Sequence, residues 1–424
     1  MNELFLHYVW QHRKYQHEKL VTANGQKIEV IHPGTYNRDA GPDFFNARLI
    51  IDGNIWAGNV EIHVDASDWI KHRHHLDPLY SNCILHVVWK HDKEVHGVDG
   101  NIIPALQLQG LLEQNCIENY DELMKSRAVI SCVEHIGTIE QHEKNWWLER
   151  MIVERLESKI KAVKRFLELT NWNWEEAFVI ALGRNFGFNI NADPFERLIR
   201  SVPLHCLLRN RDNLFVLEAI LFGQSGLIED RMEDSYFSLL GKEYEFIRKK
   251  YSLTPLDNPG WKYLRLRPSN FPEVRIAQFA SLLHRHMPVF SKCMETDNLD
   301  HLTSIFCNEV SAYWQTYLSK ENSKSGFTGM MGDQSIRLIL INTVVPFLFL
   351  RGKNEGNVDI GEKALWWLRL LQPEENNIIR AWKSAGWLPE NAAHTQALLH
   401  LYSEYCTHKK CLLCQIGHTV VSRT

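Results

Sequence analysis

Hydrophobic and polar positions divide the chain into two parts with different periodicities. Between residues 27 and 109, short apolar runs bounded by turn-forming residues predict strands at 27–32, 45–51, 55–64, 82–90 and 103–109. Asp52-Gly53-Asn54 separates two of these runs and predicts a hairpin. Before the first strand, residues 2–12 place Leu4, Tyr8 and Val9 on one face, which predicts a short amphipathic helix.

From about residue 113 the apolar positions recur at helical spacing. One stripe runs through positions 148, 151, 152, 156, 160, 163 and 167. Further helix-like stretches follow at 174–187, 194–201, 213–223, 233–251, 274–285, 297–319, 335–350, 361–371, 375–385 and 391–405. The sequence therefore predicts an α+β protein. A mixed α/β domain with a short-stranded sheet occupies residues 1–125, and an all-helical domain occupies 126–424 and ends in a Cys/His metal knuckle at 406–418.

Composition narrows the class of protein. The 424 residues are 45% hydrophobic and 23% charged, as in ordinary globular proteins. The net charge of −4 excludes a globally basic nucleic-acid binder but leaves room for a local basic face. Neither an uninterrupted apolar run of about 18 residues nor a signal-peptide pattern is found, and the nine cysteines are mostly scattered. We therefore expect a cytoplasmic protein without a membrane segment.

Acids and histidines crowd the segment from residue 42 to residue 96. Seven of the 21 histidines fall between residues 63 and 96. Side chains alternate along a strand, so Glu61 and His63 should share one face, and the hairpin should bring Asp43 opposite residues 63 to 65. Such a cluster predicts a divalent-cation site. Two other interpretations stay open: a non-catalytic metal or ligand site, and a solvated face on which Asp43 caps a turn.

The arrangement Pro42-Asp43, apolar hairpin and Glu61-x-His63 resembles the PD-(D/E)XK signature of restriction-endonuclease-like nucleases. The order helix, strand, acid-bearing strand, Glu-x-basic strand, linker and strand is also similar. This resemblance covers about the first quarter of the chain. It implies a restriction-endonuclease-like fold in which Asp43 and Glu61 hold Mg²⁺ or Mn²⁺. His63, which stands where the signature has Lys, would then orient or activate the attacking water.

On this interpretation the protein is a metal-dependent phosphodiester hydrolase acting on nucleic acid, with His72, His74 and Asp77 around the metal ligands. The alternatives are a non-catalytic nucleic-acid-binding or scaffold protein with a degenerate nuclease-like domain, and a hydrolase of small phosphoesters. Longer phrases, among them GPDFFNARL and EAILFGQSGL, resemble an uncharacterised bacterial family carried as a domain of unknown function. That resemblance covers nearly the whole chain and implies no activity.

A second group of metal-binding residue types lies near the C-terminus. Cys406, Cys411, Cys414 and His418 form C-x4-C-x2-C-x3-H, with His408 as an alternative ligand. Thiolates and an imidazole at this spacing can close a tetrahedral, structural Zn²⁺ site. An iron–sulfur cluster that uses a distant fourth cysteine and a set of free thiols are the alternatives.

A local excess of basic residues lies between residues 246 and 286. This segment contains eight Lys or Arg but only two acids, and aromatic residues are interleaved with them. This pattern favours contacts with nucleic-acid phosphates through Arg265, Arg267 and Arg275. The alternative is a solvated helical face whose arginines pair locally.

Overall fold

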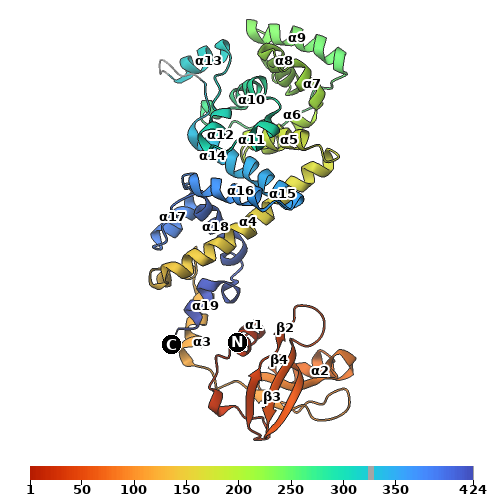
Figure 1. Ribbon diagram of the computed structural model, residues 1–424, viewed down its shortest axis with the longest axis vertical. Coiled ribbons are helices and arrows are strands. Elements are labelled where there is room, and N and C mark those ends of the chain that lie inside the picture. The colour runs from red at the N-terminus through yellow and green to blue at the C-terminus, as the bar shows by residue number, and fades with distance from the viewer. Residues whose placement is uncertain (323–328, 424) are drawn as a thin grey trace. The chain divides into compact units, whose positions relative to one another are not determined.

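The computed structural model describes residues 1–322 and 329–423, and these form two compact units (Figure 1). The first unit comprises Met1–Trp147, Arg380–Trp387 and Leu401–Thr424. The second comprises Leu148–Ile379 and Leu388–His400. The first contains the sheet and the second is helical, so the α+β class predicted from the sequence is confirmed.

A six-stranded mixed sheet forms the centre of the first unit. The strands are β1 (Ile28–His32), β2 (Thr35–Tyr36), β3 (Phe44–Ile51), β4 (Asn54–Asp65), β5 (Cys83–Lys90) and β6 (Ala105–Gln107). The order is β1-β3-β4-β5-β6, with β2 paired to β3. Pairs among β1, β3 and β4 are antiparallel, whereas β4, β5 and β6 run parallel. The crossover from β4 to β5 carries the short helix α2 (Asp68–Lys71).

The β3–β4 hairpin contains a bulge that resets its register. The turn is made by Asp52 and Gly53, which both have left-handed backbone angles (φ 51° and 81°) as a two-residue hairpin turn of this kind requires. Ala47 pairs with Gly58, but farther from the turn the register shifts by one residue. Asn46, inside the shift, has φ 58°. A one-residue shift exchanges the two faces of a strand, so this bulge decides which side chains of β3 and β4 lie together.

Helix α1 (Glu3–Gln11) packs against the sheet of the first unit. The Asn2 side chain caps it by accepting a hydrogen bond from the backbone N–H of Phe5. Tyr8 and Val9 are buried as predicted, but Leu4 is 64% exposed. The buried face instead includes Phe5, Leu6 and Trp10 together with Tyr8 and Val9. This unit also contains α3 (Gln114–Lys125), α19 (Gln415–Val421) and the start of α4 (Gln141–Leu169).

The second unit consists of packed helices. They are the rest of α4, α5 (Trp174–Phe186), α6 (Ala192–Arg200), α7 (Leu204–Asn210), α8 (Leu214–Gln224), α9 (Ser235–Tyr251), α10 (Pro272–His286), α11 (Val289–Glu295), α12 (Leu299–Ile305), α13 (Ala312–Asn322), α14 (Asp333–Ile339), α15 (Val345–Glu355), α16 (Val358–Leu370), the start of α17 (Asn377–Ser384) and nearly all of α18 (Ala392–Leu401). The stretch predicted as one helix over 297–319 is divided between α12 and α13.

One apolar helical stretch, Asp333–Glu355, is long enough to cross a membrane by length and composition. It contains the Leu338–Leu350 run with Asn342 and Pro346, and a π-helical turn joins α14 to α15 within it. Two thirds of its most apolar window is buried against the rest of the protein. Buried core helices have this same character, so the stretch is weak evidence for a membrane span.

The C-terminal segment belongs to a different unit from the one expected. The sequence analysis placed residues 406–418 in the helical domain that begins at residue 126. In the structure, residues 401–424 are part of the first unit, as are residues 126–147. Asn119 on α3 donates hydrogen bonds to the carbonyl oxygens of Val420 (3.1 Å) and Arg423 (3.3 Å), which fix α19 in this unit.

Candidate functional site

Asp43 and Glu61 lie side by side where the β3–β4 hairpin ends. Phe44 pairs with Val60, so the next pair outward is Asp43 with Glu61, and directly opposed residues share a face. The Asp43 N–H donates to Glu61 Oε2 at 3.0 Å, and the Ile62 N–H donates to Asp43 Oδ2 at 2.9 Å. The carboxylates are therefore neighbours. Asp43 faces residue 61, not residues 63 to 65 as the sequence analysis expected. The register near the turn would pair residue 43 with residue 62, and the bulge moves this partner by one residue to Glu61.

His63 follows Glu61 on the same face of β4 and is held at both ring nitrogens. Its Nδ1 shares a 2.8 Å hydrogen bond with Nε2 of His86, which lies on the adjacent strand β5. Its Nε2 lies 3.1 Å from Nδ1 of His72 and 3.6 Å from Glu61 Oε1. His63 is 1% exposed and His86 is fully buried. The His86 contact fixes the His63 ring, as residues behind a metal-binding histidine commonly do.

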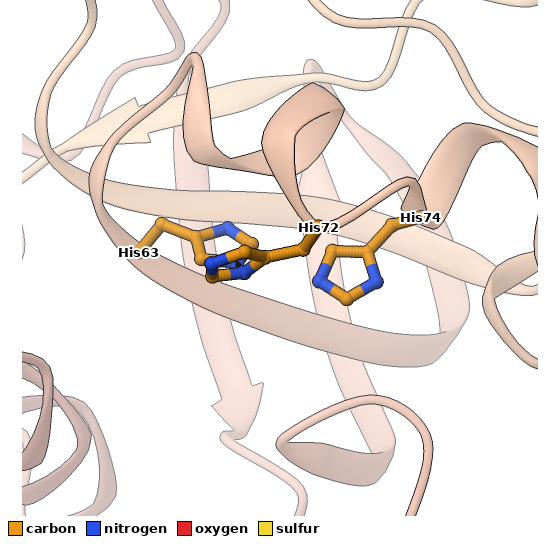
Figure 2. Close-up of side chains that lie close together, drawn as sticks. All are labelled: His63, His72 and His74. Carbon is orange, nitrogen blue, oxygen red and sulfur yellow. Dashed lines mark hydrogen bonds between the residues drawn. The ribbon is translucent and has the colours of Figure 1, made fainter.

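The β4–β5 crossover supplies His72 and His74. Arg73 between them has a left-handed backbone (φ 62°), and the three rings of His63, His72 and His74 turn toward one another (Figure 2). The ring of His74 packs on Tyr80 at a centroid distance of 3.9 Å. A non-glycine residue at positive φ is uncommon and is held there only by its surroundings. The crossover is thus built to present two histidines to the end of β4.

The Trp69 side chain anchors this crossover. It is fully buried on α2 and packs in a small core with Tyr80, Val95 and Ile103. Its indole N–H donates to the carbonyl of His96 at 3.0 Å. This core lies beneath the residues that carry the histidines, so it fixes their positions relative to the strands.

Two further ring nitrogens face the carboxylates. His74 Nε2 lies 3.3 Å from Glu61 Oε1, and His7 Nε2, from α1, lies 3.2 Å from Asp43 Oδ2. Both nitrogens are buried, and neither makes an aligned hydrogen bond. Buried polar atoms are almost always satisfied. A cation between these nitrogens and the carboxylate oxygens would satisfy them.

Burial perturbs the ionisation of Glu61 and of three histidines near it. Burial, and next the Asp43 carboxylate, raise the pKa of Glu61 well above its usual range. Burial and the neighbouring imidazoles lower the pKa of His63 to about 2, of His86 to about 3 and of His74 to about 4. These three histidines are therefore neutral near pH 7 and can offer lone pairs, whereas the two adjacent acids favour a positive charge between them.

The cluster has the donors of a transition-metal site. One ligand nitrogen from each of His63, His72 and His74 lies within 4.8 Å of the other two. His63 is buried, the His74 side chain is 12% exposed, and His72 is exposed at the solvent edge. This triad could hold a metal ion. Imidazole donors suit Fe²⁺ or Zn²⁺, and carboxylates suit Mn²⁺, whereas Mg²⁺ prefers oxygen ligands alone. The mixed donor set therefore shifts the expectation away from Mg²⁺.

The residues predicted for this site are brought together, and two that were not predicted join them. Asp43, Glu61 and His63 lie in one cluster with His72 and His74. His7 and His86 were missed as site residues. His86 stands in an apolar run, which is equally typical of a core histidine, and His7 precedes the strands on a separate helix, so no local pattern indicates either.

At the C-terminus, the four predicted zinc ligands separate. Cys406, Cys411 and Cys414 line one small cavity. His418 does not line it; its Nδ1 shares a 3.0 Å hydrogen bond with Tyr8 Oη, and its ring packs 4.6 Å from that of His12. A helix begins after Cys414, and it turns His418 toward α1.

The three arginines predicted to contact nucleic acid differ in their exposure. Arg265 and Arg267 are exposed, but Arg275 is 4% exposed. The Arg275 guanidinium donates to Gln278 (2.9 Å), Asn270 (2.5 Å) and Ser335 (3.1 Å). It also lies 4.7 Å from the centre of the Phe188 ring. Arg275 is therefore a core residue of α10, and the expectation that it contacts phosphates is corrected.

A model of the proteins of unknown function called DUF2851 matches residues 3–377. The chain belongs to the DUF2851 family. The match confirms the resemblance to a family of unknown function over most of the chain. The strands and the acid–histidine cluster lie inside the matched residues, whereas residues 406–418 lie beyond them. None of the curated proteins and none of the solved structures compared matches the chain. The comparisons give no support to the restriction-endonuclease-like resemblance.

Proposed function

We propose that the first unit is a metal-dependent phosphodiester hydrolase whose centre is the cluster of Asp43, Glu61, His63, His72 and His74. The observation that carries this proposal is the reciprocal pairing of Asp43 with Glu61 beneath imidazole nitrogens that lack bonded partners. Two adjacent carboxylates and neutral imidazoles are a suitable ligand set for one or two divalent cations. A bound cation would polarise a phosphodiester and activate a water molecule.

The chain's own residues have distinct roles in this proposal. Asp43 and Glu61 hold the cation, and their backbone hydrogen bonds keep both carboxylates in place. His63 faces the same centre and is oriented by His86, so it serves as a ligand and positioning group; the sequence analysis had also considered it as a base. His72, at the solvent edge, is placed to pass the proton of the attacking water to bulk solvent.

The resemblance to PD-(D/E)XK nucleases supports nucleic acid as the substrate class. Helix α1, strands β1 and β2, strand β3 after Asp43, strand β4 with Glu61, a crossover and strand β5 follow one another along the chain. Apart from β2, the resemblance implies elements in this order. Small phosphoesters are the alternative substrate, and they would need no extended binding surface.

A non-catalytic nucleic-acid-binding protein is the second candidate, and one observation favours it. In the second unit, a hollow of about 1320 Å³ is lined by seven Lys or Arg and four acids. Lys161 and Arg337 are among the lining residues. Glu196 and Asp193 neutralise part of this charge by pairing with Arg165 and Arg184. The remaining positive charge suits a polyanion such as a nucleic-acid backbone.

Cleavage of single- and double-stranded DNA and RNA by full-length protein tests the proposal. Metal-stripped protein is supplied with Mn²⁺, Zn²⁺ or Mg²⁺, and Glu61→Gln is the matched control because it keeps an acceptor for the Asp43 N–H. We expect metal-dependent cleavage by the wild type and a loss of at least about 100-fold in Glu61→Gln. Binding without cleavage in any metal would favour the second candidate. Cleavage of a small phosphodiester alone would favour the small-molecule alternative.

A further inference from the structure

Four cysteines of the first unit meet at one small cavity. Three are the C-terminal cysteines, and the fourth is Cys132, which lies between α3 and α4. The cavity measures about 20 Å³. Cys132, Cys411 and Cys414 are each between 8% and 9% exposed, and Cys406 is half-buried. None of these four residues belongs to the Asp43–Glu61 site.

Lys409 ties the two segments of this cluster together. Its backbone is left-handed (φ 53°), and its Nζ donates to the carbonyl oxygens of Leu123 (3.3 Å) and Ser126 (2.6 Å). It also donates to the hydroxyl of Ser131 at 2.8 Å. Ser131 precedes Cys132, so this ammonium group holds the Cys132 segment against the turn that carries the other three cysteines.

The Cys411–Cys414 turn has the form of a metal-binding knuckle. The Cys414 N–H donates to the Cys411 carbonyl at 3.2 Å. Gly417 packs against this turn so closely that a Cβ there would lie 2.0 Å from the Cys411 carbonyl oxygen.

We propose that Cys132, Cys406, Cys411 and Cys414 bind one Zn²⁺ ion as a closed tetrahedral site. Cys132 takes the place that spacing alone assigned to His418. A cavity of about 20 Å³ has room for a single ion. Four protein ligands leave no position for a substrate, so the site is structural. It joins the C-terminal segment to the first unit, much as a disulfide would in an oxidising compartment.

Cobalt substitution of the full-length protein tests the ligand set. Only sulfur ligands give thiolate-to-Co²⁺ charge-transfer absorption, so metal held by the acids and histidines of the N-terminal cluster does not contribute. We expect one equivalent of Co²⁺ with four-thiolate intensity, displaced by Zn²⁺. Cys132→Ser should reduce the intensity by at least a quarter and weaken Zn²⁺ binding. Cys116→Ser, which changes another buried cysteine of this unit, and His418→Gln should leave both unchanged.

Should Cys132→Ser fail to fold, X-ray absorption of zinc in the wild type decides instead. We expect four sulfurs at about 2.3 Å around the zinc of this site. Protein with the His72→Ala and His74→Ala changes serves as the sample, so that the N-terminal triad keeps only one of its three imidazoles. A shell of three sulfurs and one nitrogen, loss of the charge-transfer band in His418→Gln, or absence of the band in wild-type protein would overturn the proposal.

Discussion

Asp43 and Glu61 are locked together by reciprocal hydrogen bonds: the Asp43 N–H donates to Glu61 Oε2, and the N–H after Glu61 donates to Asp43 Oδ2. This arrangement brings two acids to one point without a cationic side chain between them. Such a placement is costly unless something positive occupies the space. It is the feature on which the proposed metal centre rests.

The first prediction concerns the structural part of this pairing. Glu61→Ala removes the acceptor for the Asp43 N–H and should lower the free energy of unfolding by roughly 1–3 kcal/mol, because a partly buried donor is left unsatisfied. Glu61→Gln keeps a carbonyl acceptor and should be clearly more stable than Glu61→Ala. Urea unfolding of metal-free protein measures both. Equal losses in the two variants would show that the hydrogen bond contributes nothing.

The second prediction concerns the residue behind His63. His86→Phe removes the partner of His63 Nδ1 while it keeps a ring in the buried space, so His63 loses its fixed orientation. Such changes commonly weaken metal binding by about 10- to 100-fold. Calorimetric titration with Mn²⁺ or Zn²⁺ measures the change, with His96→Asn as the exposed control. Unchanged affinity in His86→Phe would contradict the role given to His86.

The third prediction uses Glu218, a fully buried acid of α8. Burial raises the pKa of Glu218 to about 7, and Tyr236 Oη donates to one of its carboxylate oxygens. A raised folded-state pKa means that the folded protein holds the proton longer, so stability falls as pH rises from about 4.5 to about 7.

Glu218→Gln removes this titration. The variant's free energy of unfolding minus that of the wild type should be larger at pH 8 than at pH 5, by on the order of 2 kcal/mol. The variant therefore gains stability relative to the wild type as the pH rises. Denaturant unfolding at the two pH values measures the difference. The same change at Glu168, an exposed position of α4, is the control. If Glu218→Gln changes the free energy of unfolding equally at both pH values, the pKa of Glu218 is not raised by folding.

The fourth prediction distinguishes arginines that would bind nucleic acid from an arginine that stabilises the fold. Arg265→Ala with Arg267→Ala should flatten the salt dependence of any nucleic-acid binding, by roughly one unit of slope for each lost phosphate contact. Arg275→Gln should instead cost about 2–3 kcal/mol of stability, because it leaves the buried partners of the guanidinium unsatisfied. Binding that depends on Arg275 in folded protein would reverse this assignment.

Much of the sheet could be predicted because its signals are local. Asp52-Gly53 takes up the left-handed angles that a tight turn needs, and alternation in β4 puts Glu61 and His63 on one face. The partner of Glu61 could not be predicted, because it depends on a one-residue bulge at Asn46. The same hairpin without that bulge would direct Asp43 to the opposite face.

The remaining misses are contacts between segments far apart in the chain. His7 reaches Asp43 from α1, and Cys132 reaches the C-terminal cysteines from the segment before α4. A lone histidine or cysteine carries no spacing that indicates its partners. The burial of Arg275 was missed for a related reason: a count of basic residues does not show that α10 is buried on every side from Pro272 to Leu283.

The central claim is that Asp43, Glu61 and the histidines form a metal site, and titration with Mn²⁺ tests it most directly. Electron paramagnetic resonance of metal-stripped, full-length protein counts bound and free Mn²⁺. We predict at least one bound Mn²⁺ per wild-type chain and binding at least about 10-fold weaker in Glu61→Gln and in His74→Gln, with His96→Asn unchanged. Equal Mn²⁺ binding by the wild type and Glu61→Gln, or none by the wild type, would contradict the account.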